Sequence, residues 1–143
     1  MLQERPRALV LKEVIFKQGQ AVNNKTSKRL CTLDYREFKW YHDEKELQKR
    51  TPLGVIPIKC IYQTLKSKMT WLTQPTMMIS TTNWINKQEE DEGKRDFYFA
   101  CDTVVQLEKW IITIEYLRTK AVYETYMEKN VPVQFRRDSE QPE

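Results

Sequence analysis

The sequence predicts a mainly β protein, an antiparallel barrel of about seven strands closed at one end by a long C-terminal α-helix. Two observations predict this fold class. Short runs rich in β-branched and aromatic residues recur through roughly the first hundred residues, separated by turn-forming residues. After residue 102 the hydrophobic period changes from two to that of a helix. An antiparallel barrel of this size leaves one end open, and an amphipathic helix with an aromatic anchor is expected to cover it.

The expected strands follow one another from the N-terminus. The first run, residues 9–17, is rich in apolar and β-branched residues and ends at Gln18-Gly19, which is typical of a strand closed by a turn. Residues 54–58 follow a charged loop, residues 42–50, and contain Pro57. Proline cannot donate a ladder hydrogen bond, so this strand is expected at an edge or a bend. Together the strands are expected at residues 9–17, 28–33, 38–41, 54–58, 69–72, 77–82 and 97–101.

The helix is expected over residues 103–129. Thr103 with Gln106 three positions later forms a capping box, and Asn130 and Pro132 mark the end. Between them, apolar residues recur at spacings of three and four and therefore share one face: Leu107, Trp110, Ile114, Leu117 and Ala121. We expect an N-terminal tail over residues 1–8, one domain over residues 9–130 and a polar tail over residues 131–143.

The composition is that of an ordered chain with unevenly distributed charge. Hydrophobic residues make up 40% and charged residues 31% of the 143 residues, and the net charge is +4. Residues 1–59 contain 13 lysines and arginines against 7 acidic residues, whereas residues 60–143 contain 11 against 13. This asymmetry predicts a positively charged face directed at an anionic partner. No apolar run reaches the roughly 20 residues that span a bilayer and no signal-peptide pattern opens the sequence, so we expect a cytoplasmic protein.

Residue types that carry catalysis or bind metals are scarce. Cys31, Cys60 and Cys101 are widely spaced among apolar neighbours and His42 is the single histidine, so we expect small buried thiols and neither a metal site nor a disulfide. The three glycines form no phosphate-binding loop, and the acids at 89–92 form one solvated run instead of a separated acid–base pair. We therefore expect no enzyme, no catalytic residue, no cofactor and no metal.

Several short motifs carry a family resemblance. They are residues 12–19 (KEVIFKQG), 28–33 (KRLCTL), 38–41 (FKWY), 54–58 (GVIPI), 97–101 (FYFAC) and Trp110 in the helix. In this order they resemble the strands and the C-terminal helix of pleckstrin-homology (PH) domains, whose fourth strand carries a Gly-x-Ile-Pro-Leu pattern and whose best single marker is the helical tryptophan. The resemblance spans residues 9 to about 120. It implies a seven-stranded barrel of two near-orthogonal sheets capped by the helix.

The resemblance also implies a phosphoinositide headgroup held by basic residues of the first two strands, their connecting loop and the third strand. Phosphomonoesters carry nearly two negative charges and are bound by converging cationic donors. The residues that match these positions are Lys17, Lys25, Lys28, Arg29, Lys39 and Trp40. Ser27 and Leu53 stand where tight binders of the family carry basic residues, so we expect a modest affinity. Ordinary solvated surface charges are the alternative interpretation of this set.

The expected function is thus to dock a signalling protein at the inner membrane surface through a phosphoinositide or an anionic leaflet. The alternative is a protein-interaction module of the same fold, with a peptide or a small GTPase as its partner and no specific lipid binding. A nucleic-acid partner is not expected, because the acid-balanced second half would follow a phosphate backbone poorly. We expect a monomer whose extended helix, with Tyr116, Tyr123 and Tyr126, packs on a neighbouring domain.

Overall fold

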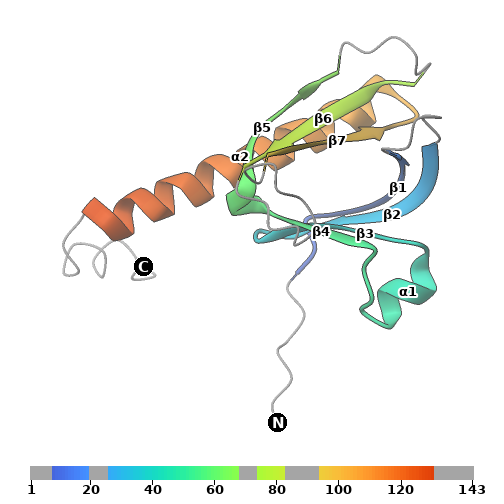
Figure 1. The fold of residues 1–143 in the computed structure, drawn as a ribbon, viewed down its shortest axis with the longest axis horizontal. Helices are drawn as coiled ribbons and strands as arrows, with labels where there is room; N and C mark the ends of the chain where they lie inside the picture. The colour runs from blue at the N-terminus through green and yellow to red at the C-terminus, as the bar shows by residue number, and fades with distance from the viewer. Residues whose placement is uncertain (1–7, 20–25, 68–73, 83–93, 131–143) are drawn as a thin grey trace.

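The structure, a computed structural model, describes residues 8–19, 26–67, 74–82 and 94–130. In this part of the chain, seven strands are followed by one long helix, as the sequence predicts (Figure 1). The strands are β1 (Leu11–Gln18), β2 (Thr26–Leu33), β3 (Glu37–Tyr41), β4 (Gly54–Pro57), β5 (Ile61–Lys66), β6 (Thr76–Thr81) and β7 (Arg95–Ala100). The helices are α1 (Glu44–Gln48), the short 3-10 helix η1 (Ile58–Cys60) and α2 (Val104–Asn130).

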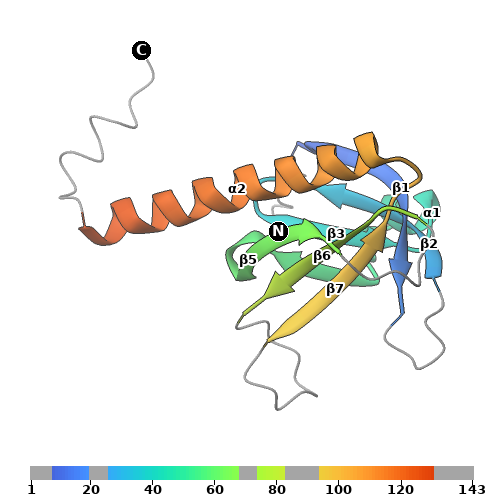
Figure 2. The same cartoon turned by 90° about the horizontal axis from the view of Figure 1, so that it is seen from above.

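The strands form one antiparallel sheet in the order β4-β3-β2-β1-β7-β6-β5. β1 is the strand at which this sheet bends, because it pairs with β2 along its whole length but with β7 only at Phe16 and Lys17. Figure 1 shows the half made of β5, β6 and β7 lying over the half made of β1 to β4. Figure 2 shows α2 along one side of both halves, with β1 running away from it and β7 returning towards it.

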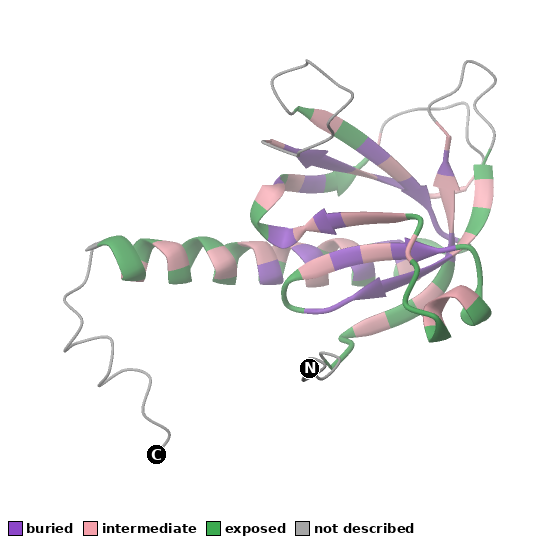
Figure 3. Ribbon diagram, turned by 60° about the horizontal axis from the view of Figure 1, so that its bottom comes forward, coloured by how far each residue is buried: buried purple, intermediate pink, exposed green. Residues whose placement is uncertain are grey.

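The core fills the space between the two halves of the sheet. Phe38 on β3 lies at its centre, with its ring centroid 4.9 Å from that of Phe99 on β7 and 5.6 Å from that of Trp110 on α2. Less exposed positions alternate with more exposed ones along β1 from Leu11 to Phe16 and along β3 from Glu37 to Trp40 (Figure 3), as expected for strands with one face towards a core. Cys31 and Cys101 belong to this core as free thiols, and burial raises the pKa of Cys101 to about 12. The prediction of small buried thiols is confirmed for these two, whereas Cys60 is half-buried.

The capping box predicted for α2 is present. The backbone N–H of Gln106 donates to the Thr103 hydroxyl at 3.1 Å, and the Gln106 side-chain oxygen accepts from the backbone N–H of Asp102 at 3.0 Å. The predicted apolar face is buried against the sheet: Leu107, Trp110, Ile114 and Leu117. Ala121 packs partly buried at its end. Past that residue α2 continues to Asn130 and extends beyond the barrel (Figure 1).

One carboxylate fastens α2 to the barrel. Glu13 on β1 accepts hydrogen bonds from the Trp110 indole N–H at 2.7 Å and from the Gln106 amide at 3.3 Å, and it forms an ion pair with Lys109. Partial burial of Glu13 opposes its ionisation, but the hydrogen bonds from Lys109, Trp110 and Gln106 outweigh it and hold the pKa of this carboxyl below its ordinary value. The buried Trp110 therefore has a partner for its only polar atom.

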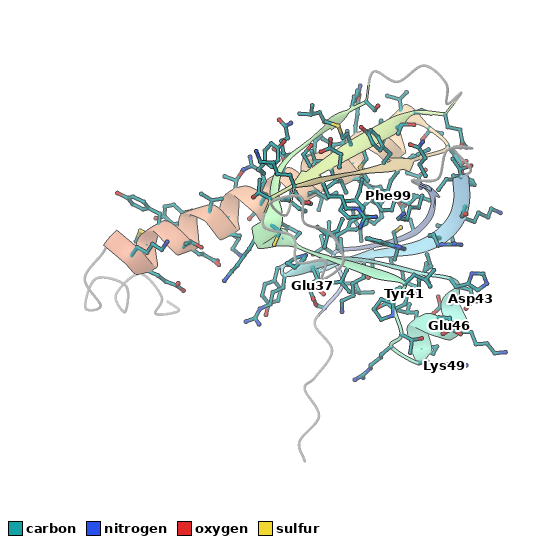
Figure 4. All side chains as sticks on the ribbon, in the orientation of Figure 1. Glu37, Tyr41, Asp43, Glu46, Lys49 and Phe99 are labelled. Carbon is teal, nitrogen blue, oxygen red and sulfur yellow. The ribbon has the colours of Figure 1, made fainter. Side chains whose placement is uncertain are left out.

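Two elements differ from the sequence prediction. The charged loop expected at residues 42–50 contains the short helix α1, because the Asp43 carboxylate caps it by accepting from the Glu46 N–H at 3.0 Å. Figure 4 shows Asp43, Glu46 and Lys49 grouped around α1, and Phe99 inside the barrel. The strand β5 at Ile61–Lys66 was not predicted, and the strand expected at residues 69–72 lies outside the described residues.

Candidate functional site

On the core-facing side of β1 and β2, the side chains change from apolar to cationic with increasing distance from α2. In the β1–β2 ladder Ile15 pairs with Arg29 and Lys17 pairs with Ser27. Paired residues of an antiparallel ladder lie on the same face of the sheet, and so do residues two apart on one strand. Ile15 is fully buried in the core, so Arg29 and Lys17 lie on that same inner face. Both side chains are half-buried.

Trp40 on β3 lies beneath Lys17. It pairs with Cys31 on the inner face of β2, and only 6% of it is exposed. The Lys17 ammonium lies 5.4 Å from the centroid of the Trp40 ring, a cation–π distance. On its other side Trp40 pairs with Gly54 of β4. Trp40 is thus the apolar floor on which Lys17 rests.

Arg95, the first residue of β7, adds a third cation that is not among the residues predicted from the sequence. It shares the inner face with Phe97 and Phe99, since the three alternate along β7, and its guanidinium carbon lies 4.6 Å from the Phe97 ring centroid. That alternation, Arg95-Asp96-Phe97-Tyr98-Phe99, was the available signal. We call the end of the barrel lined by Lys17, Arg29 and Arg95 the mouth.

The positive charges of Arg29 and Arg95 lie close enough to Lys17 to affect its pKa. Partial burial, followed by the charges of Arg95 and Arg29, lowers the pKa of the Lys17 ammonium below its ordinary value. Among the described residues, Lys17 and Arg29 form no ion pair with a carboxylate; the Lys17 ammonium donates to the carbonyl of Gln18 at 3.4 Å, and the Arg29 guanidinium donates to the carbonyl of Lys28 at 2.8 Å. Three cations from three strands, with Lys17 over Trp40 and Arg95 over Phe97, form a site suited to an anion with several oxygen acceptors.

Replacing Lys17 with methionine is expected to leave the free energy of unfolding unchanged or to raise it by up to about 1 kcal/mol in ligand-free buffer. Methionine keeps an aliphatic stem over Trp40 and removes a charge that the fold desolvates beside two others. Urea unfolding at low ionic strength measures the change. In the control Lys39→Met, which loses an ammonium 3.4 Å from Glu37, stability is expected to fall slightly. If Lys17→Met lowers the free energy of unfolding by more than about 1 kcal/mol, Lys17 serves to stabilise the fold, and a binding role is contradicted.

The sequence of the chain matches one family model, that of the PH domain, over residues 9–118. The chain belongs to the PH-domain family. No curated protein sequence matches it. In the described part of this PH domain, no helix is both long and apolar enough to cross a membrane.

Solved structures share the fold at low sequence identity. The Slm1-PH domain, described as binding ligands in a non-canonical site, superposes with a TM-score of 0.62 at 9% identity, over 77% of this chain and 97% of its own. The same domain in complex with inositol 4-phosphate gives 0.60 at 8% identity, over 76% and 96%. Human FAM129B (MINERVA, NIBAN2) gives 0.58 at 16% identity, over 82% of this chain but 23% of that one. At these identities the comparison supports the fold.

The structure brings three of the six predicted residues together and separates the rest. Lys17, Arg29 and Trp40 meet at the mouth. Lys28 pairs with Phe16 on the opposite, outer face of the sheet, where it lines a depression beside α1 to which Arg29 also contributes. Lys39 also lies on the outer face, since it alternates with the inward-facing Trp40, and it is paired with Glu37. Lys25 lies outside the described residues.

Proposed function

We propose that this PH domain is a non-catalytic module that docks its parent protein on phosphoinositide-bearing membranes, with the headgroup held at the mouth. The observation that carries the proposal is that Lys17, lying over Trp40, is close enough to Arg29 and Arg95 to feel both charges. A phosphorylated inositol presents several oxyanions, and each matches an ammonium or a guanidinium through charge-assisted hydrogen bonds. The complex of the Slm1-PH domain with inositol 4-phosphate supports this ligand class for the fold.

We propose a modest affinity. Ser27 pairs with Lys17 but brings no charge to a position where tight binders carry a basic residue. Arg95, entering from β7, supplies a cation in its place. Leu53, where tight binders carry an arginine, is exposed and apolar. Since each charge-assisted hydrogen bond contributes about 1.5–3 kcal/mol, the missing contacts matter more than the surplus of lysines elsewhere. Basic residues near an anionic leaflet add about 1 kcal/mol each and assist a peripheral association with the cytoplasmic leaflet.

Vesicle co-sedimentation tests this function. Neutral vesicles carrying single phosphoinositides are compared with vesicles of phosphatidylserine, using the wild type and Lys17→Ala/Arg29→Ala. Loss of two headgroup contacts is expected to weaken phosphoinositide binding about tenfold or more. The matched control is Lys28→Ala/Lys39→Ala, which removes the same charge from the outer face and is expected to weaken binding less than about threefold.

Equal losses in the two double variants would contradict a headgroup site at the mouth and would indicate a diffuse basic surface. No binding of the wild type to any vesicle at physiological salt would overturn the lipid proposal. That second outcome favours the alternative of a protein-interaction module, with a peptide or a small GTPase as its partner. The observation behind this alternative is the solvent-exposed continuation of α2 past Ala121, with Val122, Tyr123 and Tyr126.

A further inference from the structure

The outer face of α2 carries a row of large hydrophobic side chains that the barrel does not use. These side chains are between 59% and 78% exposed: Val105, Ile112, Tyr116, Tyr123 and Tyr126. The residues buried against the sheet, Leu107, Trp110, Ile114 and Leu117, lie on the opposite side of the helix. An exposed row of this kind is unusual on the solvent side of a helix whose other face already fills a core.

The spacing of the row is that of a two-helix coiled coil. Tyr116 and Tyr123 are seven residues apart, as are Val105 and Ile112, and Tyr126 follows Ile112 by two heptads. If Tyr116 and Tyr123 are a positions, the other three are d positions, and an a/d row is the seam along which two helices pack. We call these five residues the outer row. The same register places two polar residues in the seam, Lys109 at an a position, where it is paired with Glu13 of its own chain, and Thr119 at a d position.

The residues that flank the outer row complement a second copy of the same helix in parallel orientation. In a parallel pair each g residue meets the e residue five positions later on the partner helix. Here Glu115 at g, which is paired within its own helix with Arg118, meets Lys120 at e. Val122 at g meets Met127 at e, so opposite charges and apolar side chains coincide. In an antiparallel pair e meets e and g meets g, which brings Lys120 against Lys120 or Glu115 against Glu115 near the symmetry axis.

We propose that α2 pairs with α2 of a second copy of this chain, in a parallel two-helix dimer along the outer row. This assembly departs from the monomer expected from the sequence. It does not depend on the lipid proposal, because the outer row lies on the side of α2 that faces away from the barrel and the mouth lies at the end of β1 remote from α2 (Figure 2). Side chains of this size and exposure bury on the order of 1,000 Å² between two helices, near the lower end of stable interfaces, so the dimer dissociates at micromolar concentrations.

Sedimentation equilibrium of the full chain from about 5 to about 500 µM, a range chosen to span such an interface, tests the dimer. The wild-type mass is expected to rise from that of the 17.3 kDa chain towards twice that value. Tyr116→Ser/Tyr123→Ser is expected to stay monomeric over the same range, with circular dichroism and thermal melting confirming that the barrel is folded. A wild type that is monomeric at the highest concentration overturns the proposal and leaves the outer row to a different protein. A tyrosine variant that dimerises like the wild type overturns it as well.

Charge exchange tests the orientation. Glu115→Lys alone and Lys120→Glu alone each place like charges at both flanking pairs, and each is expected to weaken the dimer about tenfold at low salt. An equimolar mixture of these two variants restores both pairs across the interface and is expected to form heterodimers at wild-type strength. The double variant Glu115→Lys/Lys120→Glu is expected to regain the homodimer. A mixture or a double variant as weak as the single variants would exclude the parallel arrangement.

Discussion

Gly54→Ala is expected to lower the free energy of unfolding by about 2–3 kcal/mol, the cost of forcing atoms into a filled core. A Cβ atom at this position would lie 1.9 Å from Cζ2 and 2.3 Å from Cε2 of the Trp40 indole. Trp40 has little room to move, because its ring packs against Phe38, Phe97 and Phe99. Gly54 is needed for this close approach of β4 to the tryptophan, which explains why the GVIPI segment begins with a glycine.

Chemical denaturation of Gly54→Ala beside Trp40→Phe and the double variant measures the effect. Phenylalanine lacks the indole atoms that the new methyl group would meet. In the Trp40→Phe background the cost of Gly54→Ala is therefore expected to fall to less than half of its cost in the wild type. A cost below about 0.5 kcal/mol in the wild-type background, or the same cost in both backgrounds, would contradict the packing assigned to these two residues.

Glu13→Ala is expected to lower the free energy of unfolding by about 3 kcal/mol at neutral pH, since it removes an ion pair and leaves a buried indole N–H without its acceptor. Trp110 is fully buried, so water does not readily replace the lost partner. The comparison is Glu44→Ala, an exposed carboxylate of α1 paired with Lys12 at 2.9 Å, which is expected to change the free energy of unfolding far less than Glu13→Ala does. Urea unfolding of the three proteins measures both values.

The contribution of Glu13 depends on pH with a definite sign. Its pKa in the folded protein lies below the ordinary value of 4.5, so the carboxylate stabilises the fold above that value. The stability is lost as the pH falls from 4.5 through the lower pKa of the folded state. The difference between wild type and Glu13→Ala is therefore expected to be constant from pH 7 to pH 5 and to shrink below pH 4.5. If the difference in the free energy of unfolding between the two proteins is unchanged at acidic pH, the effect of Glu13→Ala comes from lost packing and not from the lost charge.

The elements that the sequence predicted are those with a strong local signal. β1 to β4, β6 and β7 have apolar runs that predict strands, and the start of α2 is fixed by Thr103 and Gln106. β5 escaped prediction because it is an edge strand on which Tyr62 and Leu65 are exposed and Thr64 is buried, so its pattern does not follow the usual alternation. α1 depends on a single cap at Asp43 and buries no side chain.

The site was predictable in part for similar reasons. Lys17 and Arg29 were predicted because they lie at the end of the strand expected at residues 9–17 and near the start of the strand expected at residues 28–33. Lys28 was selected together with Arg29, although neighbours on a strand point to opposite faces. Arg95 contributes through the contact between β1 and β7, strands far apart in the sequence, and no local spacing indicates that a cation on one will lie beside a cation on the other.

The headgroup site at the mouth is tested most directly by an NMR titration of the ¹⁵N-labelled protein with a soluble inositol polyphosphate. With this ligand, binding is measured in the absence of a membrane. If the headgroup binds at the mouth, chemical shifts are expected to change at the backbone amides of Lys17, Ser27, Arg29 and Arg95 and at the Trp40 indole N–H. Smaller changes are expected at Lys28 and Lys39 on the outer face. In Lys17→Ala/Arg29→Ala the changes at the remaining mouth residues are expected to disappear. Shifts confined to the outer face, or unchanged in the double variant, would contradict a headgroup site at the mouth of the barrel.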